Sequence, residues 1–119
     1  AQDTGFNGLS ANYEYLIAFV ALVVIAPFAE ELIFRGYLFS RLKKYAPVWL
    51  AIIITSLVFG AAHMAWNVAI DTFALSVVAC VLREMFGSIW PSILIHMMKN
   101  GLAYYLLFIN PDLLTKLGG

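Results

Sequence analysis

Three short groups of polar residues interrupt the apolar stretches of this chain, and the first is Glu30-Glu31-Leu-Ile-Phe-Arg35. Glu31 and Arg35 are four residues apart, so on a helix they share a face and can neutralise each other. Glu30 is turned by about 100° from its neighbour, which points it away from Arg35. A buried carboxylate held apart from a cation can accept a proton, as a general base must. The alternative is an ion-pair cluster that only holds helices together.

The second and third groups each contain a histidine. The second is Phe59-Gly-Ala-Ala-His63, whose small residues let a neighbouring helix approach closely and bring the imidazole to a partner. Taken alone, such a histidine is more often a core residue than a catalyst. The third is His96-Met-Met-Lys-Asn100. His96 and Asn100 share a helical face and offer two hydrogen-bond donors to one point, which is what a developing oxyanion requires.

Four apolar runs carry these groups: Tyr15–Phe39, Val48–Trp66, Val68–Leu82 and Ile89–Ile109. Backbone groups in lipid must be satisfied within their own segment, and the runs lack the alternation of a barrel, so we expect helices. The third run is short for the ~30 Å hydrocarbon layer. It must lie in a thinned region, extend through its polar flanks, or be partly re-entrant.

The composition indicates a membrane protein. Of 119 residues, 63% are hydrophobic and 12% charged, against roughly 25% charged in soluble domains, and the mean hydropathy is +0.89. The net charge of zero argues against nucleic-acid binding, and one cysteine excludes an internal disulfide framework. We therefore predict an all-α, polytopic, integral membrane bundle of about four transmembrane helices, with residues 1–119 as one domain. Basic residues at 41–44 place that loop in the cytoplasm and both termini opposite.

In this order and on separate apolar segments, the three groups resemble the CPBP family, the CAAX-prenyl endopeptidases and bacteriocin-processing intramembrane proteases. The family pattern is Glu-Glu-x-x-x-Arg, then Phe-x-x-x-His, then His-x-x-x-Asn, and the resemblance extends from about Pro27 to Asn100. Each motif is short, and the ordered set of three is the specific signal. The resemblance implies an intramembrane endopeptidase.

The resemblance also implies roles for individual side chains. Glu30 activates a water, His63 helps to position or polarise it, His96 and Asn100 stabilise the tetrahedral oxyanion, and Glu31 and Arg35 support the site. One carboxylate and two histidines could bind zinc, but the sequence has no His-Glu-x-x-His spacing. We predict an enzyme that requires no metal, with zinc as the alternative cofactor.

The predicted partners are membrane lipids, a peptide or prenylated-peptide substrate, and other membrane subunits of a larger complex, without nucleic acid. Two further functions are compatible with the sequence. The chain could be a catalytically silent, CPBP-like subunit that binds or stabilises a larger membrane complex. It could also be a small transporter or proton relay built on Glu30, Asp71 and Lys99.

Overall fold

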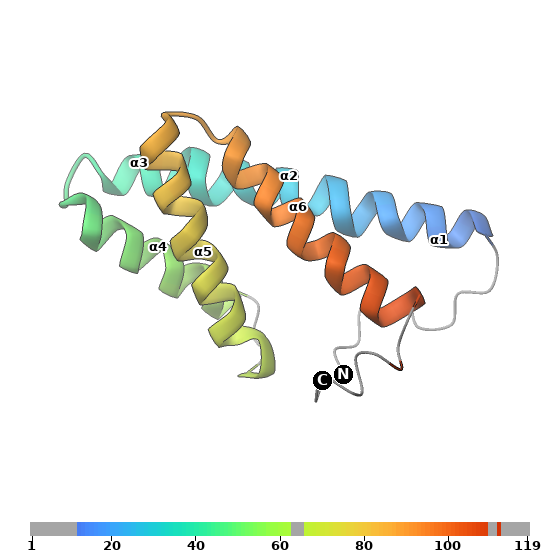
Figure 1. Ribbon diagram of the computed structural model, residues 1–119. Coiled ribbons are helices and arrows are strands. Elements are labelled where there is room, and N and C mark those ends of the chain that lie inside the picture. The colour runs from blue at the N-terminus through green and yellow to red at the C-terminus, as the bar shows by residue number, and fades with distance from the viewer. Residues whose placement is uncertain (1–11, 63–65, 110–111, 113–119) are drawn as a thin grey trace. The chain divides into compact units, whose positions relative to one another are not determined.

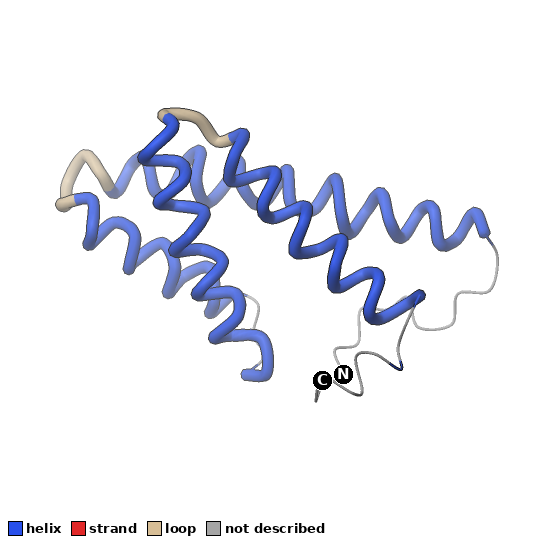
Figure 2. The backbone as a smooth tube through the Cα atoms, in the orientation of Figure 1, coloured by secondary structure: helices blue, strands red, loops and turns tan. Residues whose placement is uncertain are grey.

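The computed structural model describes residues 12–62, 66–109 and 112 of the chain. These residues form helices joined by short turns, with no strand among them (Figure 1, Figure 2), which confirms the predicted all-α fold. Two compact units divide the chain: one is Phe28–His96, and the other combines Ala1–Pro27 with Met97–Gly119. The assignment of 1–119 to one domain stays a prediction.

The first helical stretch runs from Asn12 to Leu42 and is 31 residues long. Its parts are α1 (Asn12–Phe19), η1 (Val20–Ile25), α2 (Ala26–Glu31), η2 (Leu32–Leu38) and α3 (Phe39–Leu42). Within the described part of the chain, it is the one helix that is long and apolar enough to cross a membrane. This helix contains the predicted run Tyr15–Phe39 and extends beyond it at both ends. A multi-pass topology stays a prediction.

Two segments of this helix, η1 and η2, are wound more widely than an α-helix. The Ala26 N–H donates to the Ala21 carbonyl, and the Phe39 N–H donates to the Phe34 carbonyl, so both bonds reach five residues back. Pro27 accounts for the position of η1, because its ring lacks an N–H and clashes in α geometry with the carbonyl four residues earlier. The wider winding accommodates a proline that would otherwise break the helix.

Buried side chains recur at every fourth residue of this helix, at Pro27, Glu31, Arg35 and Phe39. In a regular α-helix a repeat of four drifts by about 40° at each step. The wider turn of η2 takes more residues per turn and opposes this drift. The π-type winding thus helps to keep Glu31, Arg35 and Phe39 buried together.

The second and third helices are α4 (Val48–Ala62) and α5 (Trp66–Phe86). Helix α4 begins directly after Pro47, whose carbonyl accepts the N–H groups of Leu50 and Ala51 at 3.1 and 3.0 Å. Helix α5 has 21 residues and extends beyond the predicted run at both ends. The helix thus continues through the polar flanks of the run, and how it lies in a membrane stays a prediction.

Small and hydroxylated residues are buried on both α4 and α5. They are Ala51, Thr55, Ser56 and Gly60 on α4, and Thr72, Ser76, Ala79 and Cys80 on α5. Small side chains let helix backbones approach closely, which is how helices pack in lipid where the hydrophobic effect does not drive them together. These residues make α4 and α5 the most extensively packed helix pair of the described chain.

A tight turn joins α5 to the last helix, α6 (Trp90–Tyr104), which continues into η3 (Tyr105–Ile109). Gly87 ends α5 with a φ of +66°, the left-handed conformation that glycine adopts without a steric penalty. The Ser92 hydroxyl then donates to the Ala79 carbonyl at 2.6 Å. This bond fixes the first turn of α6 against α5 and so helps to set the position of His96, one turn further along.

In the unit formed by the two terminal segments, Ala18, Val23 and Tyr104 make a small buried cluster. The Tyr104 ring contacts Phe19 edge to face at 5.5 Å, and its hydroxyl donates to the Tyr15 carbonyl at 2.8 Å. A single tyrosine therefore ties the end of α6 to α1 by both packing and a hydrogen bond.

We expect Tyr104→Phe to lower the free energy of unfolding by about 1 kcal/mol, because the ring stays and only the hydroxyl bond is lost. The check is thermal or denaturant unfolding in one detergent. Tyr13→Phe is the matched control, since Tyr13 is 65% exposed and its loss of a hydroxyl should change little. Equal effects of the two substitutions would contradict this assignment.

Candidate active site

The first element of the site is the ion pair that the helical spacing predicts. Glu31 and Arg35 are both fully buried, and Arg35 Nε lies 3.0 Å from Glu31 Oε1. The distance is that of an ion pair, while the alignment of the two atoms falls outside that of a hydrogen bond. Arg35 Nη1 and Nη2 make no hydrogen bond in the described structure. The guanidinium is therefore held mainly by charge and by its packing.

His96 joins this pair from α6. Its Nδ1 lies 2.8 Å from Glu31 Oε2, with the imidazole 3% exposed and the carboxylate fully buried. Glu31 thus uses one oxygen for Arg35 and the other for His96, although 65 residues separate it from the histidine. An ionised carboxylate can only accept, so with Glu31 ionised it is Nδ1 that donates in this bond.

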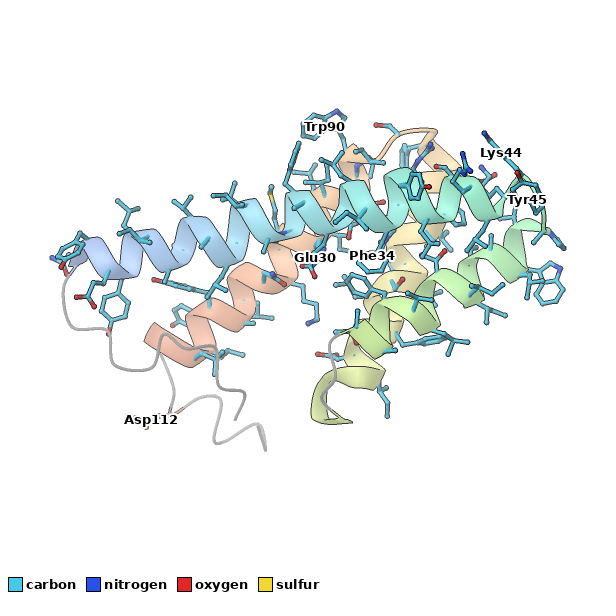
Figure 3. All side chains as sticks on the ribbon, turned by 180° about the vertical axis from the view of Figure 1, so that it is seen from behind. Glu30, Phe34, Lys44, Tyr45, Trp90 and Asp112 are labelled. Carbon is cyan, nitrogen blue, oxygen red and sulfur yellow. The ribbon has the colours of Figure 1, made fainter. Side chains whose placement is uncertain are left out.

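The orientation of His96 directs its second nitrogen to Glu30. Nε2 lies 3.6 Å from Glu30 Oε1, and the Glu30 side chain is 30% exposed where that of Glu31 is fully buried. Figure 3 labels Glu30 and Phe34, one turn apart on the same helix. Neighbouring carboxylates in the sequence therefore occupy different environments, and only one of them is open to the surroundings.

Phe59 is a member of the site that sequence reasoning did not select. Arg35 Cζ lies 4.4 Å from the centre of its ring, a cation–π contact. The ring centres of Phe34 and His96 lie 4.9 and 5.7 Å away, both edge to face. The available signal was its place at the start of the Phe-x-x-x-His motif, which drew attention to the histidine alone.

Two further predicted site residues, His63 and Asn100, have positions relative to this group that stay untested. His63 lies outside the described residues. Asn100 belongs to the other unit, where its Nδ2 donates to the Leu22 carbonyl at 2.8 Å. The catalytic roles of both, like those of Glu30 and His96, stay predictions.

The zinc alternative needs a third donor. The described residues contain no group of three His, Cys, Asp or Glu side chains placed to hold a metal ion. Glu30 and His96 supply two suitable donors, and His63, which would complete the set, lies outside the described part of the chain.

Comparison with known proteins adds independent evidence. The family model for type II CAAX prenyl endopeptidase Rce1-like proteins matches residues 12–102. The membrane-embedded CAAX protease MroQ of Staphylococcus aureus (strain USA300) is 29% identical over 129 aligned positions, which cover 97% of this chain and 52% of that protein. An uncharacterized 24.3 kDa protein of Escherichia coli is 28% identical over 89 residues, or 71% of this chain and 41% of that protein. No solved structure matches the chain.

The chain spans about half the length of the curated relatives it matches. The family match covers most of the chain and includes all three motifs, from Glu30 to Asn100. It confirms the resemblance that these motifs carry. On this evidence the chain belongs to the Rce1-like family of type II CAAX prenyl endopeptidases, a family of membrane-embedded proteases.

Proposed function

We propose that this chain is the core of an intramembrane endopeptidase that hydrolyses a peptide bond with a water activated at Glu30. The supporting observation is the unequal use of the two adjacent carboxylates. Glu31 is fully buried and bound to both Arg35 and His96, whereas Glu30 is 30% exposed and lies 3.6 Å from the outer nitrogen of the histidine. The buried carboxylate orients the site, and the exposed one takes part in the reaction.

In the proposed reaction, a water gives one proton to Glu30 while its oxygen bonds to the carbonyl carbon of the substrate. The C–N bond then breaks, and the amine nitrogen takes up that proton. The two products together contain the atoms of the peptide and of one water molecule. Because Glu30 acts as base first and as acid second, the enzyme returns to its starting state.

His96 contributes through its orientation. Its Nδ1 hydrogen is engaged by Glu31, so Nε2 faces the position where the water is activated. When Nε2 carries a hydrogen, it can donate to the oxygen that becomes negative in the tetrahedral intermediate. His63 and Asn100 are proposed, from the family resemblance, to polarise the water and to add a second donor.

The proposed substrate is a peptide segment within or beside the membrane, with or without a prenyl group. MroQ is named a membrane-embedded CAAX protease, and proteins of this family lie in membrane lipids. Recognition of a prenyl group by the present chain is a proposal, since the chain covers about half of that relative.

The test is an assay of the purified chain in proteoliposomes with a peptide that ends in a Cys-aliphatic-aliphatic-x sequence, in prenylated and unmodified forms. In ¹⁸O-labelled water, we expect the new carboxyl group to contain ¹⁸O, as mass spectrometry of the product shows. Activity that a chelator removes and zinc restores would contradict the metal-free mechanism. Absence of any cleavage by a folded protein would contradict the proposed function.

A second candidate function is a catalytically silent membrane subunit. Large apolar side chains such as Ile17, Ile70 and Met98 are exposed on the described helices, and they suit contact with lipid or with other membrane chains. Stable copurification with a larger complex in fixed stoichiometry, unaffected by Glu30→Gln and without peptide cleavage, would support it over the protease.

A further inference from the structure

Four side chains of the site form a closed cycle of contacts, in which each touches two of the others. Glu31 pairs with Arg35 at 3.0 Å and with His96 at 2.8 Å. Phe59 closes the cycle, because its ring lies 4.4 Å from the guanidinium carbon and 5.7 Å from the centre of the imidazole. The members come from α2, η2, α4 and α6. All four lie within the unit Phe28–His96.

Phe59 is well suited to this place on physical grounds. A guanidinium cannot lose its charge in a protein, and all three guanidinium nitrogens of Arg35 are buried without a hydrogen bond in the described structure. The negative face of an aromatic ring partly replaces those bonds, and such a contact is stronger away from water. The same ring packs edge to face with the imidazole, a geometry with a preferred angle as well as a preferred distance.

We propose that Phe59 is a positioning residue, which holds the His96 imidazole between its ring and Glu31 so that Nε2 stays directed at Glu30. The inference deepens the proposed function and rests on it for its effect on catalysis. A turn of the imidazole about its Cβ–Cγ bond would break the contact of Nδ1 with Glu31 and move Nε2 away from Glu30. The ring of Phe59 restricts this rotation from a second side, and Arg35 restrains Phe59 in turn.

A Phe59 that only fills space would have a different effect when it is replaced. If Phe59 only filled space, its replacement by leucine would lower stability as any buried Phe→Leu change does. Phe39 is the matched control, because it is also fully buried and also has a cation, Lys43, 5.5 Å from its ring centre. Phe39 contacts Lys43 and the α4 and α5 residues Ala51 and Cys80 rather than the histidine.

The primary test reads the imidazole directly and needs no enzymatic activity. The chain has two histidines, so ¹⁵N-histidine labelling in bicelles gives two imidazoles, which His63→Gln assigns. In the unmodified chain, we expect one His96 tautomer, with the hydrogen on Nδ1. Phe59→Leu should give a mixture of both tautomers, whereas Phe39→Leu should leave the His96 signals unchanged. An unchanged tautomer in Phe59→Leu, or an equal change in Phe39→Leu, would overturn the proposal.

Kinetics provide the second test. Phe59→Leu should lower kcat roughly tenfold to a hundredfold with little change in KM, the scale expected for a misplaced catalytic group. Replacement of Phe59 by pentafluorophenylalanine keeps the ring and its packing but removes the negative face. Pentafluorophenylalanine at position 59 should therefore lower kcat as well. Monofluorophenylalanine at the same position should retain most of the kcat of the unmodified chain. Should the chain cleave no peptide, the proposed function fails while the tautomer measurement still decides the role of Phe59.

Discussion

Glu30→Gln is expected to lower the rate of peptide hydrolysis by about 10²- to 10⁴-fold, the contribution of a positioned general base. Glutamine has nearly the same shape and can still hydrogen-bond to water, but it cannot accept a proton. Since the Glu30 side chain is 30% exposed, the substitution should leave the fold and its stability nearly unchanged. The measurement is kcat/KM in proteoliposomes, with circular dichroism and thermal unfolding of the same sample.

Glu84→Gln is the matched control for this experiment. Glu84 is exposed to a similar degree, 36%, and pairs with Lys43 at 2.5 Å, so it has the same charge and a comparable ionic partner away from the site. It should retain full activity. A Glu30→Gln enzyme that cleaves as fast as the unmodified chain would exclude Glu30 as the base and would leave His96 as the principal candidate.

Arg35→Met is expected to lower the free energy of unfolding by about 3–5 kcal/mol, because it leaves the fully buried carboxylate of Glu31 without its cation. The double variant Glu31→Gln, Arg35→Met removes both charges and should recover a large part of that loss. The apolar environment gives this result its physical reason: an isolated buried charge costs more than no charge at all. Denaturant unfolding in a fixed detergent or in bicelles measures both variants.

The exposed pair in the same unit provides the comparison for the buried one. Lys43 and Glu84 are 31% and 36% exposed, so Lys43→Met should change stability by no more than about 1 kcal/mol. Two results would contradict a stabilising charge pair between Glu31 and Arg35. One is a loss of no more than about 1 kcal/mol in Arg35→Met, and the other is a double variant less stable than Arg35→Met.

Local rules of helix geometry account for what the sequence predicted well. The apolar runs predicted four helical stretches, since a backbone in lipid must satisfy its own hydrogen bonds. The spacing of Glu31 and Arg35 predicted their pairing, because residues four apart share a helical face. The three motifs together predicted the family. Each of these inferences depends on neighbours in the sequence or on residue types.

Other features depended on contacts that no local rule contains. Nothing in the sequence indicated that the His96 imidazole would bond to the Glu31 carboxylate, or the Asn100 amide to the Leu22 carbonyl. The motif Phe59-x-x-x-His63 predicted a role for its histidine and none for Phe59. The wider winding of η2 also has no clear signal in the sequence, although it helps to bury Glu31 and Arg35 along one row.

By itself, the sequence determined that the chain is helical and apolar. It also determined that the apolar segments contain two adjacent glutamates, a Phe-x-x-x-His motif and a His-x-x-x-Asn motif. The tertiary structure alone decided that His96 takes Glu31 as its partner and turns its other nitrogen to Glu30. The physical reason is distance along the chain: a bond between residues 31 and 96 requires two helical segments that are 65 residues apart to pack together. Periodicity fixes the face on which a side chain lies, and packing fixes which side chain it meets.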